Sequence, residues 1–97
     1  MSFKEEYELE YLENEAESLV FKELEDQLNE DWAAEVCKCQ DCVLDMAALA
    51  LNTVKPFYRV SLMGKVYAGS LIDSDYGAEI RAAVKNAITK ISVNPAH

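Results

Sequence analysis

The 97-residue chain is 51% apolar and carries 18 acidic against 9 basic residues, a formal charge of −9. This apolar content suffices for one globular core, but so short a chain buries only about 60 to 68% of its unfolded surface, so a metal or second subunit would add stability. The acid excess argues against a duplex nucleic-acid binder. The longest uncharged run, Met46 to Val54, is too short to cross a bilayer as a helix, so we expect no membrane span.

Charge is distributed unevenly along the chain. Met1 to Glu6 is charged where a signal peptide would be apolar, so we expect a cytoplasmic protein with reduced cysteines. Residues 1–31 hold twelve acids and two bases, whereas residues 55–97 hold six bases and three acids. An anionic ligand is therefore compatible with the C-terminal part of the chain.

We predict a single, mainly α-helical domain over residues 1–97, beginning with a long N-terminal helix from Ser2 to Leu28 inside the acidic segment 1–31. Ser2 and Glu5 have the spacing of a capping box. A helical stripe of apolar residues follows: Leu9, Leu12, Ala16, Leu19, Val20, Leu24 and Leu28. Such a helix would be about 40 Å long, so it would project from the domain or span a dimer.

The segment 37–52 combines a cysteine cluster with a central helix, Val43 to Asn52. This helix is nearly all apolar, so we expect it to be the buried element, and Asp41 is placed to cap it. Trp32 is expected to anchor the preceding connection against the core. A helix so apolar is hard for one small chain to cover alone, which also favours a dimer.

The rest of the chain predicts a strand and a last helix. Polar and apolar residues alternate from Tyr58 to Met63, and Gly64-Lys65 can close a short β-hairpin onto Val66 to Ala68. The C-terminal helix is predicted over residues 73–93, capped by Asp73 or Ser74. Its buried face steps by three and four residues: Tyr76, Ile80, Val84, Ile88 and Ile91.

Cys37, Cys39 and Cys42 form a Cys-x-Cys-x-x-Cys cluster that predicts a metal site. A helix N-terminus stabilises the thiolates of Cys39 and Cys42, and Cys37 offers a third sulfur. Thiolates at tetrahedral separation select zinc, and a structural site usually has four ligands. The fourth is open among several candidates: Asp31, Glu35, Asp41, His97, a water or a residue of a second subunit. The alternatives are three reduced cysteines packed as small apolar side chains, or a redox switch.

Catalytic motifs are missing from the sequence. The only histidine, His97, is the last residue, so no Cys-His or Ser-His pair has a firm base. Gly64, Gly69 and Gly77 form no phosphate-binding loop. We therefore predict that the protein is not an enzyme.

The run from Cys37 to Asn52, which ends in Ala-Leu-Ala-Leu-Asn, resembles the signature of the late-competence protein family ComFB. Pro56-Phe57-Tyr58 is similar to the family's Pro-x-Tyr, and Lys55 stands where many members have another proline. The upstream match is an Asn-x-x-Glu-x-x-Val pattern, formed by Asn14, Glu17 and Val20. The closing Asn94-Pro95-Ala96-His97 also occurs in members.

The resemblance implies a small, mainly helical homodimer that binds zinc through its cysteines. Because some members are receptors for cyclic di-GMP or cyclic di-AMP, the resemblance also implies, as the leading hypothesis, a regulatory module that binds such a cyclic dinucleotide and relays the signal to a protein partner. The residues best suited by charge and ring chemistry to hold its phosphates and bases are Tyr58, Arg59, Lys65 and Arg81. The alternative is a zinc-stabilised adaptor linked to late competence that binds an unidentified protein partner without a small ligand. In a receptor these four residues should converge on one pocket, whereas in an adaptor they would be scattered.

Overall fold

The computed structural model describes residues 2–60 and 75–95, and there it is a small, mainly helical domain, as predicted. It also contains a two-stranded sheet. Its helices and strands in chain order are α1 (Phe3–Glu6), β1 (Leu12–Asn14), α2 (Glu15–Leu28), α3 (Gln40–Thr53), β2 (Tyr58–Val60) and α5 (Asp75–Val93). Short 3₁₀ turns occupy Leu9–Tyr11 and Asp31–Ala33. Among the described residues, no helix combines the length and the apolar character needed to span a membrane.

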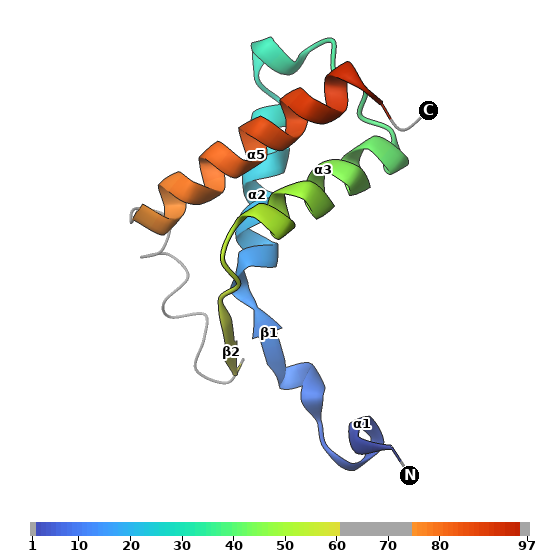
Figure 1. Ribbon diagram of the computed structural model, residues 1–97, viewed down its shortest axis with the longest axis vertical. Helices are drawn as coiled ribbons and strands as arrows, with labels where there is room; N and C mark the ends of the chain where they lie inside the picture. The colour runs from blue at the N-terminus through green and yellow to red at the C-terminus, as the bar shows by residue number, and fades with distance from the viewer. Residues whose placement is uncertain (1, 61–74, 96–97) are drawn as a thin grey trace.

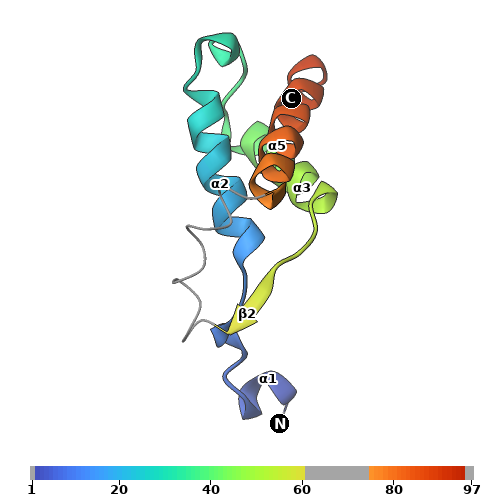
Figure 2. The ribbon, with the colours of Figure 1, turned by 90° about the vertical axis from the view of Figure 1, so that its left-hand side faces the viewer.

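The core lies where α2, α3 and α5 meet. Figure 1 shows α5 packed alongside α2 and α3, while the β1–β2 ribbon and α1 extend from one end of this three-helix body. Figure 2 shows the same projection of α1 from the side. The fully buried side chains include Val20 from α2, Met46 from α3, and Val84 and Ile88 from α5. Buried alanines among them, such as Ala50 and Ala87, allow the helices to approach closely.

The helical periodicity correctly identified the core faces of α2 and α5. On α2, Val20 and Leu24 are buried, and on α5, Ile80 and Val84 are buried. Tyr76 and Ile91 pack at the edge of the core as half-buried residues. The described part of α5 begins at Asp75, so the predicted caps Asp73 and Ser74 lie outside the described residues.

The prediction of one long helix from Ser2 to Leu28 is wrong, because the helix is interrupted between Tyr7 and Asn14. The capping box of Ser2 and Glu5 is present, but it starts only the single turn α1. Residues 2–13 are all exposed, so no packing there offsets the repulsion between neighbouring glutamates. Leu9 and Leu12 keep the helical spacing but do not join the core.

The chain between α1 and α2 instead forms β1, which pairs antiparallel with β2. Leu12 lies opposite Val60, Glu13 opposite Arg59, and Asn14 opposite Tyr58. The strand predicted from Tyr58 is therefore confirmed at its start. The hairpin expected onto Val66 to Ala68, with Gly64-Lys65 at its turn, lies outside the described residues.

Asn14 fixes the junction between the ribbon and α2. Its side-chain Oδ1 accepts a hydrogen bond from the backbone N–H of Ala16 at 3.2 Å, which caps α2. The same oxygen accepts the N–H of Phe57 at 2.7 Å, and the Glu15 N–H donates to the Phe57 carbonyl at 2.7 Å. These bonds hold the chain before β2 against the start of α2.

The central helix differs from its prediction in two ways. It begins at Gln40 and is capped by Cys39, so the cap predicted at Asp41 is wrong. It is also only partly buried, because Leu44 is 56% exposed while Met46 is fully enclosed. Trp32 is 42% exposed, and its ring lies 5.4 Å from the Lys85 ammonium, so it contacts α5 at the surface and is not a core anchor.

Candidate metal centre and ligand-binding residues

The three cysteines come together where the turn after α2 enters α3. Cys42, in the first turn of α3, is buried in the core, and Cys37 and Cys39 are half-buried against it. Lys38, between them, donates through Nζ to the carbonyls of Ala33 at 2.8 Å and Val36 at 3.2 Å. These two hydrogen bonds stabilise a tight turn of the loop, in which the three cysteines lie close together.

The sulfur atoms of Cys37, Cys39 and Cys42 all lie within 4.8 Å of one another. In a tetrahedral zinc site with Zn–S bonds of about 2.3 Å, neighbouring sulfurs are about 3.8 Å apart. A contraction of about 1 Å or less would therefore bring the three sulfurs to a single ion. The three cysteines can bind a metal ion.

Cys39 has a second role as the N-cap of α3. Its backbone is extended, and its Sγ accepts a hydrogen bond from the Cys42 N–H at 3.4 Å. This sulfur therefore lies at the positive end of the helix dipole.

The environment of Cys37 favours the thiolate. Its pKa is lowered from the ordinary thiol value, chiefly because the backbone N–H of Cys39 donates to its sulfur. The side chains of Cys39 and Cys42 and the positive charge of Lys38 act in the same direction, against the opposing effect of burial. A thiolate is the form that binds a metal, so this loop is suited to metal binding before any ion enters.

None of the carboxylates predicted as a fourth ligand joins the three sulfurs. Within residues 2–60 and 75–95, the cluster consists of cysteines alone, without Asp31, Glu35 or Asp41. His97 lies outside the described residues. The candidates that remain for this position are His97, a water and a residue of a second subunit.

A metal in this cluster would join two parts of the fold. It would tie the loop that follows α2 to the first turn of α3, which otherwise depends on backbone bonds and on the packing of Cys42. Three thiolate ligands closing such a loop are typical of a structural site.

Arg59, one of the residues expected to hold a phosphate, forms an ion pair within the fold. Its guanidinium Nη2 forms an ion pair with Glu15, and the two side chains are 13% and 8% exposed. Glu15 also accepts a hydrogen bond from the Ser18 hydroxyl at 2.9 Å. The remaining guanidinium nitrogens of Arg59, Nε and Nη1, are buried and have no hydrogen-bond partner among the described residues.

Tyr58 lines a hollow that also includes Glu15, the ion-pair partner of Arg59, but Arg59 is not among the residues that line it. This hollow has a volume of about 510 Å³, and Tyr58 shares it with Leu12, Phe21 and three glutamates, Glu13, Glu15 and Glu17. It is large enough for a nucleotide, but its charge is unfavourable for a ligand with two phosphates.

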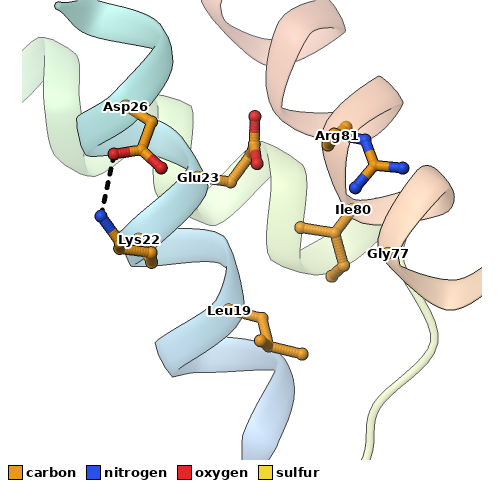
Figure 3. A pocket seen from close by; sticks show the side chains of 7 residues that line it. All are labelled: Leu19, Lys22, Glu23, Asp26, Gly77, Ile80 and Arg81. Carbon is orange, nitrogen blue, oxygen red and sulfur yellow. Dashed lines mark hydrogen bonds and ion pairs between the residues drawn. The ribbon is translucent and has the colours of Figure 1, made fainter. Parts of the chain in front are cut away.

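Arg81 lies in a third place, between α2 and α5. Figure 3 shows its guanidinium on the α5 side of a small pocket, with Glu23, Lys22 and Asp26 on the α2 side. Lys22 and Asp26 pair at 3.0 Å, and the pocket volume is about 120 Å³. This is below the range of about 300 to 1,000 Å³ typical of small-molecule sites. The predicted ligand residues Tyr58, Arg59 and Arg81 do not converge, and Lys65 lies outside the described residues.

Sequence reasoning missed a groove between α2 and α3. It has a volume of about 250 Å³, and its lining includes two exposed apolar side chains, Phe21 and Leu44. The sequence does contain a sign of this groove. Phe21 and Leu44 are large apolar residues that lie next to the apolar stripe of their helix that faces the core, and not within it.

Comparison with known proteins agrees with this architecture. Residues 13–95 match the family model described as late competence development protein ComFB. The chain belongs to the ComFB family. A solved structure of the late competence protein ComFB from Bacillus subtilis superimposes with a TM-score of 0.69 and 27% identity, over 88% of this chain and 92% of that one. No curated protein matches this sequence.

Proposed function

We propose that the protein is a zinc-stabilised regulatory module of the cytoplasm that acts by binding a protein partner and catalyses no reaction. The convergence of three cysteine sulfurs at the start of α3 carries this proposal. Zinc is the metal that a cluster of thiolates selects in a reducing compartment. The metal's role is structural, and function lies in the surfaces that the stabilised helices present.

The adaptor function leads because the predicted ligand residues lie apart. Arg59 is paired with Glu15, Tyr58 adjoins a glutamate-rich hollow, and Arg81 lines a pocket too small for a dinucleotide. A receptor for a doubly charged anion would concentrate its cationic groups around one roomy site.

A cyclic-dinucleotide receptor is the second candidate. Within residues 2–60 and 75–95, two buried guanidinium nitrogens of Arg59 have no hydrogen-bond partner, and such groups are able to bind an oxyanion. Tyr58 on the same strand is 61% exposed, which leaves its ring open to a base.

One preparation tests both parts of the proposal. The protein is purified without chelator, its zinc content is measured, and cyclic di-GMP and cyclic di-AMP are each titrated in by calorimetry. We expect about one zinc per chain, since the three thiolates form one site. Much less than one zinc would contradict the metal site, whereas heat from either nucleotide at hundred-micromolar concentration would make the receptor the leading function.

We also propose a homodimer. The long first helix that favoured a dimer is interrupted, but exposed apolar side chains on residues 3–12 support self-association: Phe3, Tyr7, Leu9, Tyr11 and Leu12. The acidic arm that carries them, residues 2–12, precedes the part of the chain matched by the family model.

A further inference from the structure

We infer that the groove between α2 and α3 is the docking site for a basic amphipathic helix of a protein partner. The inference rests on the proposed adaptor function and deepens it by naming the chemistry of the partner. It depends on an apolar floor, an acidic rim, and the absence of a suitable occupant elsewhere in the described chain.

The floor of the groove is apolar. Six of its lining residues are hydrophobic, and they are Phe21, Leu24, Leu28, Val43, Leu44 and Ala47. Phe21 is 50% exposed and Leu44 is 56% exposed, although each stands next to core residues of its own helix. Two large side chains left half in water beside one groove are typical of a surface that a partner covers.

The rim of the groove is acidic. On α2, Glu17 and Glu25 stand four residues before and after Phe21, so helical geometry places them on the same face. On α3, Asp41 stands three residues before Leu44, so it lies on the same face of that helix. All three carboxylates are exposed, and Glu25 is the charged residue among the described residues that lines the groove itself.

This charge argues against occupants taken from the same protein. Two copies facing each other through this groove would bring six carboxylates together, since each copy contributes Glu17, Glu25 and Asp41. The arm of residues 2–12 is an equally poor match, because it holds four glutamates and one lysine. An apolar stripe flanked by lysines or arginines complements both the floor and the rim.

A helix is the element that fits this geometry. The groove runs between two neighbouring helices, where a third can lay its i, i+3, i+4 and i+7 side chains against an apolar floor. Rim carboxylates then meet basic residues on either side of that stripe, which fixes orientation and speeds association.

The test uses the full, metal-loaded chain and a fluorescent model peptide of about 18 residues, with leucine on one helical face and lysine on the other. One control peptide has the same composition in an order that abolishes the apolar face. A second replaces each lysine with glutamate. We expect the amphipathic lysine peptide to bind, and both controls to bind at least about tenfold more weakly, because each lacks one of the two complementary features.

Variants then locate the site. Phe21→Ser should weaken binding roughly three- to tenfold, because about half of the ring is available to be covered. Adding Leu44→Ser should bring the loss to roughly ten- to a hundredfold. The matched control is Phe3→Ser, which removes an exposed phenylalanine from the arm without changing charge and should leave binding unaltered. Glu25→Lys should weaken binding and reduce its dependence on salt.

The inference would be overturned if Phe3→Ser and Phe21→Ser weakened peptide binding equally. It would also be overturned if the scrambled peptide bound as tightly as the amphipathic one, since binding would then reflect charge attraction without a defined site. A native dimer that becomes monomeric in Phe21→Ser would also overturn it and assign the groove to a second copy. Zinc content and melting temperature are measured on every variant. If the three cysteines do not bind zinc, the native protein will contain little zinc, and this result does not depend on whether the peptide binds.

Discussion

Arg59 and Glu15 illustrate how a side chain's role depends on its neighbours. Arg59 was chosen for its charge, but in the fold its guanidinium faces the Glu15 carboxylate with both side chains largely out of solvent. Removing one member of such a pair leaves the other charge buried and unpaired, which costs more than the pair itself contributes. A loss of ligand binding in an Arg59 variant would therefore have to be separated from a loss of stability.

We predict that Arg59→Met lowers the free energy of unfolding by about 3 kcal/mol or more, because Glu15 keeps a buried charge. Methionine preserves much of the apolar stem, so the effect reports the charge. Combining Arg59→Met with Glu15→Gln should cost clearly less than the sum of the two single changes. Urea unfolding of the four proteins gives the coupling, and additive effects would show that the pair is not the stabilising unit.

Cys39 offers a second test, because it serves as both helix cap and candidate ligand. Serine is a strong N-cap and alanine is not, so Cys39→Ser removes only the thiolate, whereas Cys39→Ala removes both functions. With zinc present, both variants should lose metal and melt lower than the native protein. With chelator present, Cys39→Ser should melt as high as the native chain, and Cys39→Ala should be less stable by about 1 kcal/mol.

Metal analysis and thermal melts with and without chelator check this prediction. Asp41→Asn is the matched control, because Asp41 is exposed beside the cluster but does not belong to it. Its zinc content should equal that of the native protein. Unchanged metal content in Cys39→Ser would rule out a site that depends on this sulfur.

At the scale of helices and strands, the sequence predicted which helix faces are buried, because hydrophobic periodicity determines them. A three-helix core imposes the 3.6-residue repeat, which places Val20 and Leu24 on the buried face of α2, and Ile80 and Val84 on that of α5. Leu9 and Leu12 follow the same repeat without a core to face, so periodicity alone could not reveal the break. The pairing of β1 with β2 joins segments more than forty residues apart, which no local pattern encodes.

The candidate sites also differ in whether the local sequence could predict them. The cysteine cluster was predictable because its ligands lie within six residues and a helix start brings them together. The Arg59–Glu15 pair and the α2–α3 groove depend on where separate elements meet. Charge and side-chain type could suggest Arg59 as a ligand residue, but not the carboxylate that it contacts.

Asn14 is the residue on which the unexpected junction depends. We predict that Asn14→Ala lowers the free energy of unfolding by roughly 1 to 3 kcal/mol, since it removes the cap of α2 and the acceptor for the Phe57 N–H. Asn14→Asp retains the acceptor oxygen and should lose much less. Chemical unfolding of both variants measures the difference, and equal losses would mean that the amide N–H group, not the acceptor, is essential.

At the scale of the whole molecule, the chain divides into a helical body and a projecting arm. The body holds every buried hydrophobic residue of the described chain, whereas residues 2–12 hold none. Figure 1 places α1 at the end of the molecule farthest from the core of α2, α3 and α5. An arm with exposed aromatic rings is stable in water chiefly when another surface covers it, which is why we assign it to the dimer contact.

We predict that the native protein has twice the mass of its 10.9 kDa chain in light scattering at micromolar concentration. Replacing both Tyr7 and Tyr11 with serine should weaken the dimer by about 2 kcal/mol, or about 30-fold in dissociation constant, because each half-exposed ring loses its cover. Substituting Leu24 would be uninformative, since it is 4% exposed and its loss would unfold the monomer itself. Phe21→Ser is the control outside the arm and should remain dimeric. A native protein that scatters as a monomer would show that the arm's apolar residues serve a different partner.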